Sequence, residues 1–186
     1  YGNTPLHLAA DRGLDAAVSR IIEIMSDINV MNIVGMSKKQ AIDLQNHAGK
    51  TPLHMAVYKK CDAVIRKLLA EGANPMIADS LGNTVLHIAS QHNYPRETIN
   101  AIIEAAGPSP NQLLCQNGLT QPLCASSFEQ STDDYLNRDV ASVSGASGII
   151  NLRNQEGRTA LMSAIHFENG DLAEILLCNG ADPTIP

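Results

Sequence analysis

The stretch GKTPLHMAVYKKCDAVIRKLLAEGAN, residues 49 to 74, decides the fold. Thr51 is a favourable N-cap for a helix whose first residue is Pro52, where the missing N–H costs no hydrogen bond. Apolar residues then recur at helical spacing in two short series, and Gly72 is a suitable residue for the end of the second series. The stretch therefore predicts a helix, a tight turn and a second helix.

The start of this stretch occurs four times in the chain. The interval from Gly49 to Gly82 is 33 residues. Two short amphipathic helices cannot bury their apolar stripes against each other alone, so the units are expected to stack side by side. The four starts are Gly2–Ala10, Gly49–Val57, Gly82–Ser90 and Gly157–Ile165.

This pattern resembles the ankyrin repeat, in which Gly-x-Thr-Pro-Leu-His-x-Ala-Ala is followed by a second helix and then by Gly-Ala-Asp or Gly-Ala-Asn. The chain contains this ending at residues 72–75 and 180–183. The resemblance implies an all-α ankyrin-repeat solenoid of stacked helix-turn-helix units with short hairpin loops. We expect about five repeats in one domain over residues 1–186, with the fourth repeat degenerate.

The spacing of the glycines sets the predicted boundaries. Gly49 follows Gly2 by 47 residues, so the first unit is expected to carry an insert at residues 26–40. This insert is either a lengthened outer helix with a projecting finger or a loop, because inserts in repeat proteins map to one face. The predicted units are 1–46, 47–79, 80–115, 116–153 and 154–186.

The fourth unit is the least regular. Gly157 follows Gly82 by 75 residues, which equals two periods of 33 and about nine more. The segment from Gly118 to Ser126 retains only part of the pattern, and residues 142–148 resemble a flexible loop. Because the chain begins inside a repeat, we also expect it to be part of a longer protein.

Composition and charge exclude several classes of protein. The formal net charge is -6 and the pI is near 5.4, whereas sequence-independent binding of phosphate backbones depends on clustered Lys and Arg. No apolar run approaches the length of a membrane span, and no signal peptide is recognisable. The four cysteines are scattered, which is typical of reduced thiols in a cytoplasmic or nuclear protein.

Nothing in the sequence supports catalysis, a metal site or a cofactor. His7, His54 and His87 occupy the histidine position of the repeat, and the resemblance implies that each ring bonds the Thr hydroxyl and neighbouring backbone. Their spacing is not that of a zinc site. No nucleophile motif and no glycine-rich phosphate loop is present. The other histidines, at 47, 92 and 166, are expected to be exposed.

The remaining candidate is a protein-binding surface. In ankyrin proteins the hairpin tips and the solvent-facing ends of the inner helices line a concave groove. An inert spacer surface is the alternative. Tyr58 and Phe167 stand out because exposed aromatic side chains anchor interfaces. By register, the implied groove positions are Asn3, Asp11, Arg12, His47, Lys50, Tyr58, Lys59, Leu81, Asn83, Gln91, His92, Gln155, Glu156, Arg158, His166 and Phe167.

Among ankyrin proteins, the chain is similar to the inhibitor-of-nuclear-factor-kappa-B group, on the strength of Asp79-Ser80-Leu81-Gly82-Asn83-Thr84-Val85-Leu86-His87-Ile88-Ala89. That group binds Rel-homology transcription factors, which implies a role in masking or modulating such a dimer. A general ankyrin scaffold for an unrelated cytoplasmic or membrane-linked partner is the alternative, and a ligand-gated or enzyme-regulatory module is a third. The predicted groove is not acidic, because four cations face only Asp11 and Glu156.

Overall fold

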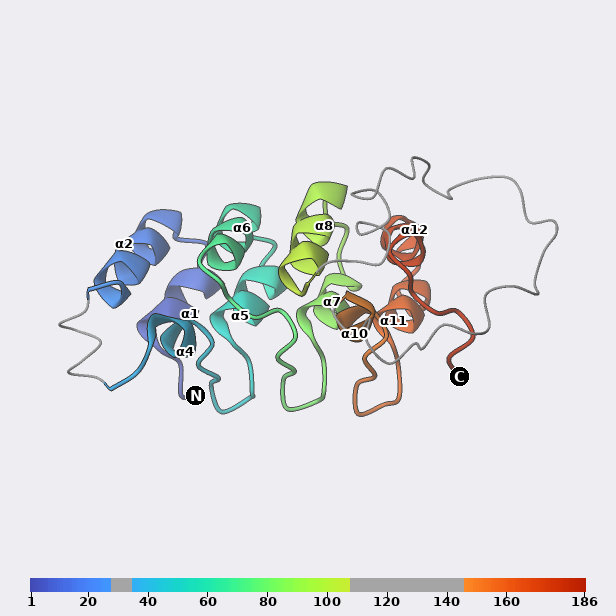
Figure 1. Cartoon of the computed structure of the whole chain (residues 1–186), viewed down its shortest axis with the longest axis horizontal. Helices are drawn as coiled ribbons and strands as arrows, with labels where there is room; N and C mark the ends of the chain where they lie inside the picture. The colour runs from blue at the N-terminus through green and yellow to red at the C-terminus, as the bar shows by residue number, and fades with distance from the viewer. Residues whose placement is uncertain (28–34, 108–145) are drawn as a thin grey trace.

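The computed structural model describes residues 1–27, 35–107 and 146–186. These residues form a stack of helix pairs in two rows, with hairpin loops projecting along one edge (Figure 1). No strand occurs in the described ranges, and the predicted all-α stack is confirmed. The inner row is α1 (Pro5–Asp11), α5 (Pro52–Tyr58), α7 (Val85–Ala89) and α11 (Ala160–His166). The outer row is α2 (Asp15–Met25), α6 (Asp62–Ala70), α8 (Arg96–Ala105) and α12 (Gly170–Cys178).

Each inner helix begins after a threonine with extended backbone. In α5 the Thr51 hydroxyl oxygen accepts the backbone N–H of His54 at 3.4 Å. The Nδ1 atom of His54 in turn accepts the Thr51 backbone N–H at 3.2 Å, so both groups at the helix start are satisfied. The predicted N-cap and Pro start of this helix are confirmed.

The core is a continuous strip between the two rows. Large apolar side chains such as Leu53, Leu86 and Ile102 are at most 1% exposed. Alanines at the contact between successive inner helices, such as Ala56 and Ala89, are fully buried and permit close approach. Each fully buried Leu or Ile contributes about 1.5–3 kcal/mol to folding, so stability accumulates along the stack.

Two short helices occupy the segments before the hairpin loops. α4 (Lys38–Ile42) packs on α2, and α10 (Ala146–Ile150) packs on α8 in the same way. The outer helix α2 ends at Met25, so of the two alternatives for residues 26–40 the lengthened outer helix is not the one observed. Residues 28–34 of that insert lie outside the described residues. The flexible loop predicted at 142–148 is wrong for residues 146–148, which are helical.

Backbone hydrogen bonds join each hairpin loop to the next. The Ser80 N–H donates to the Ala48 carbonyl at 3.0 Å, and the Gln155 N–H donates to the Leu81 carbonyl at 2.9 Å. Gly82 lies at φ +77°, and a Cβ atom there would come within 2.8 Å of the Gln155 nitrogen. Glycine is therefore required both for the turn and for the close approach of the next loop.

The last unit packs directly on the third. The bond from Gln155 to Leu81 is the register equivalent of the bond between the second and third loops, and α11 and α12 contact α7 and α8. The buried Asn169 amide also donates to the backbone carbonyls of Ser90 and His92 at 3.3 and 2.8 Å. Most of the predicted fourth unit, residues 116–145, lies outside the described residues.

Candidate functional site

The groove positions expected from register are accessible. All sixteen are exposed or partly exposed in the structure. The large apolar members are prominent, since Tyr58 is 48%, Leu81 63% and Phe167 46% exposed. Exposed side chains of this size on one face are candidates for contact with a partner.

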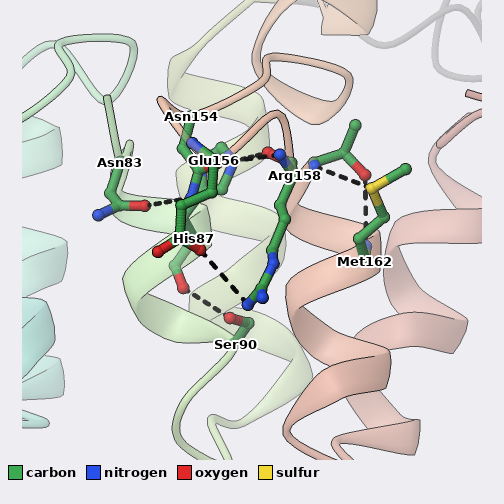
Figure 2. A network of polar contacts seen from close by, with 8 residues as sticks. Asn83, His87, Ser90, Asn154, Glu156, Arg158 and Met162 are labelled. Carbon is green, nitrogen blue, oxygen red and sulfur yellow. Dashed lines mark hydrogen bonds and ion pairs between the residues drawn. The ribbon is translucent and has the colours of Figure 1, made fainter. Parts of the chain in front are cut away.

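One pocket gathers seven of these positions between the third and the last unit. Its volume is about 490 Å³. Leu81 and Phe167 supply apolar side chains at its wall, and Arg158 and Glu156 form an ion pair at 3.4 Å. Figure 2 shows the Arg158 side chain extending between α7 and α11. The lining residues are Leu81, Asn83, His87, Gln91, Asn154, Gln155, Glu156, Arg158, Ser163 and Phe167.

Some predicted groove residues have structural roles at the loop edge. The Asn83 side-chain oxygen accepts the Asn154 amide at 2.9 Å (Figure 2), and Asn3 accepts from Asn46 at 2.8 Å. The Gln155 amide donates to the Ser80 carbonyl at 2.9 Å. These side chains already satisfy hydrogen bonds within the fold, so they are weaker candidates for contact with a partner than Tyr58 or Phe167.

A second group, which belongs to the predicted concave groove, surrounds Tyr58 at the C-terminal end of α5. The ammonium groups of Lys50 and Lys59 lie 5.3 and 5.6 Å from the centre of the Tyr58 ring. Both distances are within the range of cation–π attraction. Lys59 also forms an ion pair with Asp11 at 3.6 Å. Sequence register predicted all four residues, and the structure brings them together.

His92 connects Tyr58 with the interior. Its ring meets the rings of Tyr58 and Tyr94 edge to face, at 6.3 and 6.5 Å between centres. The Tyr94 hydroxyl donates to the Val57 carbonyl. Desolvation, with a smaller contribution from the nearby charge of Lys60, lowers the pKa of His92. The ring is half-buried, so the prediction that it is simply exposed is wrong.

His7, His54 and His87 join successive units, as the repeat pattern predicts. Each Nε2 lies 2.8 to 3.2 Å from a backbone carbonyl of the next unit, at Lys50, Asn83 and Arg158 respectively. A carbonyl only accepts, so Nε2 carries the proton and Nδ1 accepts from the preceding threonine. Burial lowers the pKa of all three rings, that of His54 to about 4. They are structural side chains.

The remaining predicted positions lie outside both groups. His47 is exposed beside Gly2, and His166 meets Phe167 edge to face at 5.1 Å. Register did not indicate that Asn154 and Ser163 line the pocket. The sequence signal that could have indicated Asn154 is its position three residues before Gly157, which matches the position of Asp79 before Gly82 at the start of a hairpin loop.

In the described ranges, no group of three or more His, Cys, Asp or Glu side chains is arranged to hold a metal ion. None of the helices in these ranges has the length and apolar character to cross a membrane.

Comparison with known proteins agrees with the stack of helix pairs. A family model described as ankyrin repeats in three copies matches residues 32–113 and 86–186, and a single ankyrin repeat matches residues 1–33. The chain belongs to the ankyrin-repeat family. Its relatives also include the group predicted from the sequence.

Human B-cell lymphoma 3 protein is 29% identical to this ankyrin-repeat chain over 97% of the chain and 29% of the relative. Chicken nuclear factor NF-kappa-B p105 subunit is 30% identical over 96% of the chain and 17% of the relative. The crystal structure of the ankyrin repeat domain of Bcl-3, a member of the IkappaB protein family, matches with TM-score 0.62 and 28% identity. That match covers 97% of the chain and 58% of the Bcl-3 domain chain. The predicted resemblance to the inhibitor-of-nuclear-factor-kappa-B group is confirmed.

Proposed function

We propose that this chain is a non-catalytic ankyrin module that binds a Rel-homology transcription factor through its concave face. In this role it regulates the factor in the cytoplasm and the nucleus. The chain spans less than two fifths of the length of each of the first two curated relatives that it matches, so the proposal concerns only this region of repeats.

The observation that carries the proposal is the similarity to an IkappaB-family ankyrin domain along 97% of the chain. The concave face supports it, because exposed aromatic side chains lie beside a pocket and beside charged groups. Tyr58 is preorganised by contacts with His92 and two lysines. An aromatic side chain already held in place loses little entropy on binding, which favours an interface anchor.

Binding of the full chain to purified Rel-homology dimers tests the proposal. We expect capture of the dimers by the wild-type protein, and at least about tenfold weaker binding by Tyr58→Ala, which corresponds to about 1.4 kcal/mol. Ile24→Ala is the matched control, because Ile24 is also 48% exposed but lies on the outer helix α2. It should bind as the wild type does.

Two results would contradict the proposal. In one, the folded wild-type protein fails to capture Rel-homology dimers and instead recovers an unrelated partner from cell extract, as expected for a general scaffold. In the other, Ile24→Ala weakens binding and Tyr58→Ala does not, which would place the interface on the outer helices.

A further inference from the structure

The concave face has two chemically different ends. The basic end comprises Lys50 and Lys59 at the Tyr58 ring, with Arg12 at the end of the inner helix of the first unit. The pocket end is the cavity of about 490 Å³ with Leu81 and Phe167 at its wall. The Tyr58 part of the basic end lies on the second unit and the pocket lies between the third and the last unit of the same stack, so one extended segment of a partner could contact both.

Positive charge at the basic end is only partly compensated. Lys59 pairs with Asp11 at 3.6 Å. Within the described ranges, Arg12 and Lys50 form no ion pair with a carboxylate. An ammonium held over an aromatic ring, as Lys50 is over Tyr58, is still free to accept an anion on its other side. The basic end is therefore complementary to negative charge.

The pocket end differs because its Arg158 and Glu156 charges neutralise each other. Arg158 pairs with Glu156 at 3.4 Å. The exposed Leu81 and Phe167 side chains leave apolar surface at the wall, and Gln91 and Ser163 add uncharged polar groups. A bulky apolar side chain would bury surface there without leaving a charge unpaired.

We propose that the concave face binds an extended acidic and apolar peptide segment of its partner. An Asp or Glu side chain docks between Lys50 and Lys59 at Tyr58, and a bulky apolar side chain enters the pocket at Leu81 and Phe167. From Tyr58 on α5 to the pocket between α7 and α11, the segment crosses about one and a half to two helix spacings of about 8–10 Å each. An extended chain rises about 3.3 Å per residue, so about four to six residues separate the two groups. This inference rests on the proposed use of the concave face for protein binding.

A protein segment fits this surface better than a nucleic acid. The whole chain carries a formal charge of -6, which disfavours a long polyanion, whereas a few carboxylates need only the local cations. In the pocket beside the cations, the Arg158 charge is paired with Glu156, whereas Leu81 and Phe167 offer apolar surface to a side chain.

Fluorescence anisotropy with a labelled synthetic peptide tests the proposal. The probe carries Glu-Asp-Glu at one end and Leu-Phe at the other, separated by four Gly or Ser residues. We expect saturable binding to the full chain that weakens as salt rises from 50 to 200 mM. Replacing the three acids by Lys should abolish binding, and replacing Leu-Phe by Gly-Gly should weaken it about tenfold or more.

Variants assign the two ends. Lys50→Glu and Lys59→Glu should each weaken peptide binding about tenfold or more, and Phe167→Ala should weaken binding of the Leu-Phe probe but not of the Gly-Gly probe. Arg66→Glu is the matched control, because it makes the same charge change at an exposed position of α6 and should have little effect. Circular dichroism melting confirms that each variant is folded.

Three outcomes would overturn the inference. They are peptide binding unaffected by Lys50→Glu and Lys59→Glu, tighter binding of the Lys-substituted peptide, or a duplex DNA that binds more tightly than the acidic peptide and is lost in the same variants.

Capture of Rel-homology dimers separates the two proposals. Dimers captured equally by wild type and Lys50→Glu, with no peptide binding, would refute the acidic segment alone. Peptide binding without capture of dimers would refute the Rel-homology partner alone.

Discussion

The loop edge, where the hairpin loops meet the starts of the inner helices, and the concave face differ in whether the same side chain recurs from one unit to the next. Along the loop edge, His7, His54 and His87 make the same bond to the next unit. On the concave face, the equivalent positions Tyr58 and Gln91 have unrelated chemistry. Side chains that recur at one register therefore hold the units together, and those that vary are available to a partner.

The largest effect is expected at the recurring histidine. In His54→Ala the Asn83 carbonyl loses its donor, Thr51 loses its cap partner and a buried cavity remains. We expect a loss of about 3–5 kcal/mol in the free energy of unfolding, measured by urea denaturation. Met162→Ala is the control at the same register, because Met162 is partly exposed and donates no bond to another unit. It should cost about 1–2 kcal/mol, and equal costs would contradict this account.

The close approach of the loops is expected to give the next largest effect. Gly82→Ala combines a positive φ of +77° with a Cβ atom 2.8 Å from the Gln155 backbone nitrogen. We expect it to lower the free energy of unfolding by about 2–3 kcal/mol. Gly157→Ala has a similar φ of +75° but meets nothing within 4 Å, so it should cost only about 1 kcal/mol. A thermal melt of the two variants measures the difference, which should vanish if the loops do not touch.

Acid should weaken the loop edge. Burial lowers the pKa of His54 to about 4, so the unfolded chain binds the proton more readily than the folded chain. The stabilising contribution is therefore fully present above pH 6.5 and is lost as the pH falls toward 4. From pH 7 to pH 5 this residue should account for about 2 kcal/mol, with His7 and His87 adding in the same direction.

Urea denaturation of the wild type and of His54→Gln at both pH values measures this loss. The Gln side chain keeps an N–H donor but does not titrate, so this variant should lose less stability in acid. An equal loss in the two proteins would show that His54 is not responsible.

The smallest effects on stability are expected on the concave face. Arg12→Ala and Gln91→Ala remove exposed side chains, so each should change the free energy of unfolding by less than about 0.5 kcal/mol. Chemical denaturation at pH 7 measures both. A cost above about 1 kcal/mol at either position would mean that this face supports the fold as the loop edge does.

Local chemistry explains which features could be predicted from the sequence. Caps such as Thr51 are formed by residues a few positions apart, so the starts of the inner helices followed from the repeat pattern. The contact between Leu81 and Gln155 did not, because a 75-residue interval fits either another unit or an insertion. Register also placed Tyr58 and Lys59 on one face. It could not show that the Asn83 side-chain oxygen accepts a hydrogen bond from Asn154 in the neighbouring loop.

The bonds from Ser80 to Ala48 and from Gln155 to Leu81 have a further mechanical consequence. Hydrogen bonds have a narrow range of length and direction, whereas apolar contacts are non-directional and each is worth only about 0.1–0.2 kcal/mol. A stack joined by hydrogen bonds along its loops resists deformation most at the loops and is more compliant between its helices. Bending would therefore change the spacing of the helices more than the spacing of the loops. The curvature of the molecule could then adapt to a bound surface while every repeat keeps its own shape.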